Sequence, residues 1–219
     1  MKFVTKSLAA LALAAGSLSA QAGLVDLYGL PGNFNQATFG ATGSQYYAQS
    51  ITADASNFAN LRFTVNDAQG GTFKLHITTG LPAGLPGTGD RPDAGNELFS
   101  ETLTHAGGGA ADFNVNLNLS VTAGEVLFFV LDAVGQSLTG ATVLATQFGG
   151  SDKYTGGEFI YANTNAALGS AVWTSRFGAN EDLVFRAEFN NGNSVPEPAS
   201  LALVGITLLG AVAARRRRS

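Results

Sequence analysis

The 219-residue chain contains no cysteine, and it has only two histidines, one tryptophan and one methionine. The absence of cysteine excludes disulfide bonds and thiolate metal sites. The folded part of the chain must therefore be stabilised mainly by its hydrophobic core. Oxygen ligands remain available, so calcium is the cofactor that this composition still allows.

Positive charge is scarce in the middle of the chain. Of the 12 Lys and Arg residues, two lie at positions 2 and 6 and four at positions 215–218. Six basic residues remain between them, against 15 of the 16 acidic residues, so residues 23–194 carry a formal charge of about −9. Binding to nucleic-acid phosphates needs a basic surface. The sequence therefore excludes a nucleic-acid partner.

Residues 199–214 form an uncharged apolar run near the C-terminal end. As a helix rising about 1.5 Å per residue, the run would span roughly 24 Å, a little less than a bilayer core of about 30 Å. Flanking arginine side chains can extend that length by reaching toward the membrane surface. Four arginines follow the run directly, and positive charge marks the cytoplasmic end of a membrane segment. They are Arg215, Arg216, Arg217 and Arg218. The run predicts a short transmembrane helix, with the rest of the chain facing away from the cytoplasm.

A proline-bounded segment precedes this run. Pro196 and Pro198 disfavour a helix, and Glu197 between them is expected in an extended, exposed conformation. An exposed extended segment is accessible to a processing enzyme. The ordered set of Pro196-Glu197-Pro198, apolar run and arginine cluster resembles the PEP-CTERM sorting signal of Gram-negative bacteria. The resemblance implies recognition and processing by an integral-membrane exosortase, and delivery to the outer surface or the exopolysaccharide matrix.

The N-terminal residues predict export independently. Lys2 and Lys6 form a basic region, residues 8–15 are apolar, and Ala20-Gln21-Ala22 has the small-x-small form of a signal-peptidase site. Cleavage there gives a mature chain that starts at Gly23. We therefore expect a signal peptide over residues 1–22, one domain over 23–194, and the sorting signal over 195–219.

The central domain is predicted to be all-β. Apolar and polar residues alternate over 61–66, 73–78, 113–119 and 183–189, as in half-buried strands, and 126–131 is apolar throughout, as in a central strand. Glycine pairs separate these runs and indicate turns. Eight to ten short strands of this kind predict an antiparallel β-sandwich of the jelly-roll type. The element order also resembles the small jelly-roll domains often found ahead of a PEP-CTERM tail.

Few residues suggest catalysis. His76 and His105 are interpreted as surface histidines, because no G-x-S-x-G elbow accompanies them. Four acidic residues are interpreted as solvated, because no motif selects a catalytic pair from them. These residues are Glu158, Glu181, Asp182 and Glu188. The sequence therefore predicts a protein without catalysis, with a polysaccharide-acting enzyme as a remote alternative.

One segment has several oxygen-bearing side chains close together. Asp90, Asp93, Asn96 and Glu97 supply hard ligands of the kind that calcium takes, although their spacing is not that of an EF-hand. A polar loop is the simpler interpretation. No other cofactor is predicted.

A second group of residues suggests contact with sugars. Asn114, Asn116 and Asn118 lie on one face of a predicted strand, and amides of this kind bind sugar hydroxyls. Aromatic rings could stack on sugars, but most are interpreted as core or edge packing. They are Tyr46, Tyr47, Tyr154, Tyr161 and Trp173. We predict a structural or adhesive protein of the cell surface or matrix, with a non-catalytic carbohydrate-binding module as the alternative. Ice binding is a remote alternative, because the threonines form no regular array.

Overall fold

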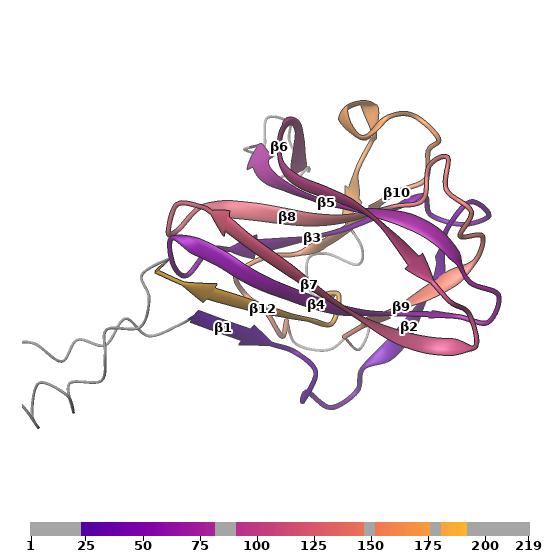
Figure 1. The fold of residues 1–219 in the computed structure, drawn as a ribbon, viewed down its shortest axis with the longest axis horizontal. Helices are drawn as coiled ribbons and strands as arrows, with labels where there is room; N and C mark the ends of the chain where they lie inside the picture. The colour runs from indigo at the N-terminus through magenta and orange to yellow at the C-terminus, as the bar shows by residue number, and fades with distance from the viewer. Residues whose placement is uncertain (1–22, 82–90, 147–151, 176–180, 192–219) are drawn as a thin grey trace, which may run out of the picture. The chain divides into compact units, whose positions relative to one another are not determined.

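The computed structural model describes residues 23–81, 91–146, 152–175 and 181–191 (Figure 1). These residues form twelve strands and one short 3-10 helix, η1. The strands are β1 (Gly23–Asp26), β2 (Phe34–Phe39), β3 (Tyr46–Thr52), β4 (Asn57–Asp67), β5 (Gly71–Leu81), β6 (Arg91–His105), β7 (Gly109–Ser120), β8 (Val126–Asp132), β9 (Ala141–Ala145), β10 (Phe159–Ala162), β11 (Thr174–Ser175) and β12 (Phe185–Asn190), and η1 spans Leu168–Ser170.

The strands form two sheets in which every paired strand is antiparallel to its neighbours. Sheet A has the order β1-β12-β4-β9-β2, with β7 paired to β4 along the other edge of that strand. Sheet B has the order β11-β10-β3-β8-β5-β6. The all-β, antiparallel prediction is confirmed. The twelve described strands exceed the eight to ten that the sequence indicated, and the jelly-roll order stays a prediction.

The core lies between the two sheets. Alternate residues of β4, β7, β9 and β12 meet alternate residues of β3, β5 and β8 in one buried cluster. Phe63 of sheet A lies 6.2 Å from Phe73 and 6.2 Å from Phe129 of sheet B, between ring centroids. Phe129 in turn contacts Phe185 at 5.4 Å. Each such pair of rings adds about 0.5–1.5 kcal/mol to the stability, beyond the contribution from burying their surface area.

Strand β8 lies in the middle of sheet B, between β3 and β5, as its uninterrupted apolar sequence predicted. Its residues alternate between two clusters. Leu127, Phe129 and Leu131 face the core between the sheets, whereas Phe128 and Val130 belong to a second, smaller cluster on the other side of sheet B. Both faces of sheet B are therefore apolar at its centre. Sheet A is apolar on one face only, which leaves its other face free for polar side chains.

The structure corrects the interpretation of the segment at 90–97. Residues 91–97 belong to strand β6 and are not a polar loop. Arg91, Pro92 and Glu97 pair with the end of β5, and residues 93–96 form an irregularity between these pairs. Asp90 lies outside the described residues, as do the predicted signal peptide at 1–22 and the sorting tail. Within the described part of the chain, no helix is long and apolar enough to cross a membrane.

Candidate functional site

Two rows of side chains cross sheet A on the face that points away from the core. Direct register pairs place the members of each row side by side across four strands, β1, β12, β4 and β7. The first row is Asp26, Arg186, Arg62 and Asn114, and the second row is Leu24, Glu188, Asn60 and Asn116. We call these eight residues the polar face. Seven of them are polar, and Leu24 is the one apolar member.

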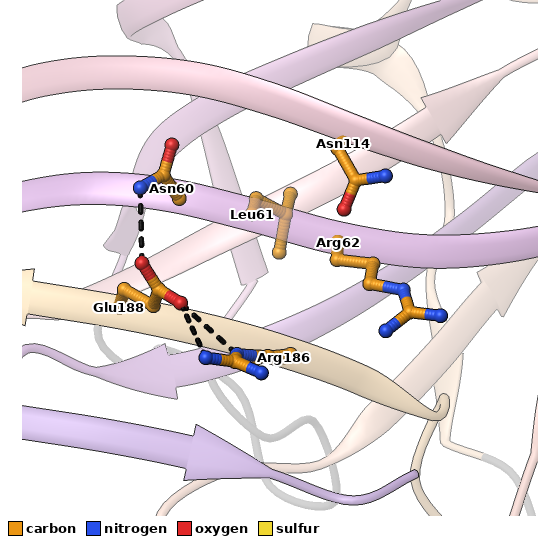
Figure 2. A pocket seen from close by; sticks show the side chains of 6 residues that line it. All are labelled: Asn60, Leu61, Arg62, Asn114, Arg186 and Glu188. Carbon is orange, nitrogen blue, oxygen red and sulfur yellow. Dashed lines mark hydrogen bonds and ion pairs between the residues drawn. The ribbon is translucent and has the colours of Figure 1, made fainter.

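A pocket of about 270 Å³ lies at the centre of the polar face, lined by Asn60, Leu61, Arg62, Asn114, Arg186 and Glu188 (Figure 2). Leu61 is fully buried, and its neighbours on β4 project outward. The other five lining residues offer amide, guanidinium and carboxylate groups. All five groups are planar and can make two hydrogen bonds to one partner; the Asn114 amide has no described partner, and the others keep the donor or acceptor capacity that their ion pairs leave.

Ion pairs hold the two arginines of the polar face in place. Arg186 bonds Glu188 at 2.7 Å and lies 3.8 Å from Asp26. Glu188 also accepts a hydrogen bond from the Asn60 amide at 3.0 Å. Arg62 pairs with Asp112 at 2.5 Å. Both guanidinium charges are therefore neutralised by carboxylates on the same surface.

The edge of the pocket is fixed by Tyr28. The Arg62 guanidinium carbon lies 4.3 Å from the centre of the Tyr28 ring, a cation–π contact. The Tyr28 hydroxyl bonds Thr64 Oγ1 at 2.9 Å, and Thr64 donates to Asp112 at 2.6 Å. Burial is the main cause that raises the pKa of Tyr28 to about 12. The hydrogen bond from Thr64, together with the Arg62 guanidinium, holds the pKa of Asp112 below its usual range.

Two polar groups on this surface have no hydrogen-bond partner among the described residues. Arg62 Nε is buried and unbonded, because Nη2 of the same side chain carries the bond to Asp112. The exposed amide of Asn114 lines the pocket without a bond to any described side chain. By contrast, Asn116 accepts a hydrogen bond from Asn118 at 2.9 Å. The predicted row Asn114, Asn116, Asn118 is confirmed as an exposed row on β7.

Both histidines are buried, so their interpretation as surface residues is wrong. His76 is 8% exposed and lies between two carboxylates, with Nδ1 at Glu97 and Nε2 3.2 Å from Asp132. His105 is 2% exposed; its Nε2 donates to the Val65 carbonyl and its Nδ1 accepts from Gly107. Each ring is enclosed by strands that the local sequence does not reveal. Both nitrogens of each ring are already engaged.

Two of the acidic residues that were interpreted as solvated are also buried. Glu181 is 1% exposed and Asp182 is fully buried. Asp182 accepts hydrogen bonds from Gln49 at 3.0 Å and from the Tyr154 backbone at 3.1 Å. Burial is the main cause that raises its pKa to about 7. Glu188 lies on the polar face, and the backbone carbonyl of Glu158 accepts a bond from Ser50.

The described calcium candidates point to separate partners. Asp93 accepts a hydrogen bond from the Gly95 backbone, Asn96 donates to Thr79, and Glu97 bonds His76. Among the residues that the structure describes, no group of three or more His, Asp or Glu side chains is arranged to hold a metal ion. Calcium binding at this segment stays a prediction.

The aromatic candidates divide between core and edge. Tyr46 and Tyr47 are buried, as the packing interpretation predicted, and Tyr154 and Tyr161 are half-buried. Trp173 is half-buried at the edge of the smaller cluster on sheet B. Tyr28, which supports the polar face, was missed by the sequence reasoning. The sequence feature that could have indicated Tyr28 is its position two residues after Asp26, the acidic residue that ends β1.

The described residues define an antiparallel two-sheet domain that carries a polar array on one outer surface. Residues 194–218 match the family model of the PEP-CTERM protein-sorting motif. The chain therefore carries a PEP-CTERM sorting signal, which confirms the resemblance drawn from its sequence. This signal identifies an exported protein that is sorted to the cell surface, and it implies processing by an exosortase.

Two solved structures show a distant similarity to the chain. One is a clostridial cysteine protease, Cwp84, after propeptide cleavage, with a TM-score of 0.47 and 13% identity over 78% of this chain. The other holds the cysteine protease and lectin-like domains of Cwp84, a surface layer associated protein of Clostridium difficile, with a TM-score of 0.44 and 12% identity over 78% of this chain. The matches span only 40% and 36% of those chains. No curated protein matches the sequence.

Proposed function

We propose that this protein is a non-catalytic adhesive component of the cell surface or its exopolysaccharide matrix, and that its polar face binds a neutral polysaccharide. The observation that carries the proposal is the pocket on sheet A, where amide, guanidinium and carboxylate groups from three strands converge. The exposed Asn114 amide there has no partner among the described residues.

The chemistry of the polar face suits sugar hydroxyls. Neighbouring hydroxyls on a sugar ring act together as donor and acceptor, and planar amides, carboxylates and guanidiniums match such pairs with two bonds each. The ion pairs Arg186–Glu188 and Arg62–Asp112 fix the side chains before a ligand arrives. A ligand therefore binds without a large cost in side-chain ordering.

Charge favours a neutral polysaccharide over an acidic one. Each arginine of the polar face is already paired with a carboxylate. The domain as a whole carries a formal charge of about −9, which repels a polyanion at low ionic strength. Binding to a neutral chain should change little with salt.

The same pocket supports the absence of catalysis. Glycoside hydrolysis needs two carboxyl groups that face each other across the scissile bond, roughly 5–9.5 Å apart. Among the described residues that line the pocket, Glu188 is the one carboxylate, and Arg186 and Asn60 occupy it. The two buried histidines are engaged elsewhere, so neither is available as a base at this surface.

The proposal includes a route to the surface. The apolar run at 199–214 anchors the exported protein in the inner membrane, and an exosortase acts at Pro196-Glu197-Pro198 before release to the surface or matrix. The family match at 194–218 supports this order of events. The signal peptide over 1–22 would start the same route.

Binding can be tested by calorimetric titration of the exported protein with neutral and with acidic polysaccharides. We expect affinity for at least one neutral polysaccharide, and a loss of about tenfold in the double variant Asn114→Ala/Asn116→Ala, since two hydrogen bonds contribute roughly 1–3 kcal/mol together. Asn35→Ala, on an exposed position of β2, is the matched control. Absence of binding to any polysaccharide would leave a purely structural role in its place, and cleavage of a polysaccharide would contradict the non-catalytic assignment.

A further inference from the structure

The opposite side of the molecule carries a second, smaller cluster. On the outer face of sheet B, apolar residues of β3, β8 and β10 are covered by the chain segment 163–173 (Figure 1). The Tyr46 hydroxyl donates to the Ala166 carbonyl at 2.8 Å and so ties this segment to the sheet. The Trp173 ring packs 5.7 Å from the Tyr46 ring. The segment is therefore a fixed part of the fold.

A small cleft lies where this segment meets the start of β6. It encloses about 120 Å³, and its lining includes Leu168, Trp173, Arg91 and Asp93. Gly169 brings the segment close to β6, because a Cβ atom at this position would lie 3.3 Å from Ala94 Cβ. One wall of the cleft is thus aromatic and aliphatic, and the other carries a cation and an anion.

We propose that this cleft is a second glycan-binding site, which takes one neutral sugar residue with its ring against Trp173. A sugar ring has an apolar C–H face and a polar rim, and the cleft is divided in the same way. Tryptophan provides the aromatic face, while Arg91 and Asp93 can bond the rim hydroxyls. Arg91 is exposed and makes no hydrogen bond or ion pair with the described residues.

The size of the cleft argues for a single ring. Pockets for drug-sized ligands enclose roughly 300–1,000 Å³. A cleft of about 120 Å³ is well below that range, so it accommodates one unit of a polymer and leaves the rest of the chain in solvent. Affinity at such a site is low for a free sugar, and it becomes useful when many sites bind one polymer.

The two sites lie on opposite outer faces of the two-sheet domain. The polar face belongs to sheet A, and the Trp173 cleft belongs to the cover of sheet B, with the core between them. If both bind the same kind of polymer, each molecule joins two polysaccharide chains. This cross-linking role rests on the proposed function of the polar face, whereas the Trp173 site itself stands without it.

The two sites can be tested separately because the chain has one tryptophan. Tryptophan emission of the exported protein, excited at wavelengths that its five tyrosines do not absorb, then reports on the Trp173 cleft alone. The probes are cellohexaose, laminarihexaose, mannohexaose and chitohexaose. We expect a saturable change in emission with at least one of them, weakened about five- to tenfold in Arg91→Ala. The change should persist in Asn114→Ala/Asn116→Ala, which alters only the polar face. Val172→Ala is the matched control, since this neighbouring side chain is 81% exposed.

The outcomes separate the two proposals. If no probe changes the emission, or if Arg91→Ala responds like the unaltered protein, the Trp173 site is refuted even where calorimetry shows binding at the polar face. If emission changes while Asn114→Ala/Asn116→Ala has no effect on binding, the polar face is refuted and the cleft is retained. For cross-linking, the unaltered protein should raise the viscosity of a long polysaccharide that it binds. At the same protein concentration Arg91→Ala should raise it less, and an equal rise would refute cross-linking.

Discussion

His76 joins three neighbouring strands of sheet B, and its protonation should control part of the stability of the domain. The ring lies on β5, with Glu97 on β6 on one side and Asp132 on β8 on the other. Burial lowers the pKa of His76, but the hydrogen bonds to Asp132 and Glu97 outweigh it, so the pKa is raised above its usual value. The stabilisation is then complete below the unfolded-state pKa of about 6.5 and is lost as the pH rises through the folded-state pKa.

The two carboxylates should contribute unequally. The Asp132 side chain is 11% exposed and the Glu97 side chain is 38% exposed. At pH 6 we expect Asp132→Asn to lower the free energy of unfolding by about 1.5–3 kcal/mol, as for a buried hydrogen bond to a charged group. Glu97→Gln should cost only about 0–1 kcal/mol, because solvent screens this pair. The cost of Asp132→Asn should shrink at high pH, where the asparagine amide can donate to the neutral ring.

The assay is urea unfolding of the unaltered protein and His76→Gln over pH 5.5–9. Asp182, whose pKa of about 7 is also raised, titrates in both proteins and cancels in the difference between them. The difference in unfolding free energy should decrease as the pH rises above about 6.5. A difference that is constant with pH, or one that grows, would refute the assignment of a charged His76 to the folded state. Equal costs for Asp132→Asn and Glu97→Gln at pH 6 would refute the argument from exposure.

Four further outcomes are expected. Phe129→Ala should lower the unfolding free energy by about 3–5 kcal/mol in urea, because the ring is fully buried between the sheets; a cost below about 1 kcal/mol would contradict this packing. Gly157→Ala should lower the melting temperature strongly, since its Cβ would lie 1.9 Å from the Ser50 carbonyl oxygen, whereas Gly29→Ala meets nothing within 4 Å and serves as control. EDTA should lower the melting temperature if calcium binds near residues 90–97, and an unchanged value would remove that prediction. Replacing residues 196–198 by alanines should leave an uncut protein in the inner membrane, and normal release would contradict processing at this motif.

The sequence predicted the strands whose alternation is regular. The pattern at 61–66 and 113–119 corresponds to β4 and β7, with Phe63 buried and Asn114 exposed as their positions indicated. Such a pattern is reliable because the side-chain period of a strand is two and one face is buried. Segment 90–97 was misjudged because its proline, glycine and acidic residues are typical of a turn. Pairing of Arg91, Pro92 and Glu97 with β5 places the segment in β6, and residues 93–96 between them stay irregular.

The chemistry of the two histidines could not be read from the sequence. His76 lies on the expected outer side of β5, but Glu97 and Asp132 reach it from strands 21 and 56 residues away. His105 is enclosed in the same way by the Val65 carbonyl, 40 residues distant. A local pattern shows which way a side chain points from its own strand. It does not show which strands lie beside it, and these decide burial and partners.

The polar face itself depends on an irregularity that breaks the alternation. Phe58 and Asn60 are two residues apart on β4. The residues that pair with them are one residue apart on β12 and three residues apart on β7. The extra residue relative to β12 is Ala59, and β7 accommodates its own extra residue where Asn118 takes a positive φ of 49°. Without this bulge, Phe58 and Asn60 would point to the same side of the sheet, because they are two residues apart. With it, Phe58 stacks on Phe189 at 4.6 Å in the core, while Asn60 projects outward to Glu188.

The bulge therefore couples the core to the candidate site. It lets the 57–58 end of β4 and the 61–65 stretch both bury their apolar residues, and it places Asn60 between Glu188 and Asn116 in the second row. Bulges of this kind re-aim side chains at functional surfaces. Deleting Ala59 would make Phe58 and Asn60 adjacent and in regular register with β12, so they would still point to opposite faces, but one step along β4 would then have to match three steps along β7. At this point β4 has one residue more than β12 and one fewer than β7, and the two irregularities together keep Asn60 in register with both Glu188 and Asn116.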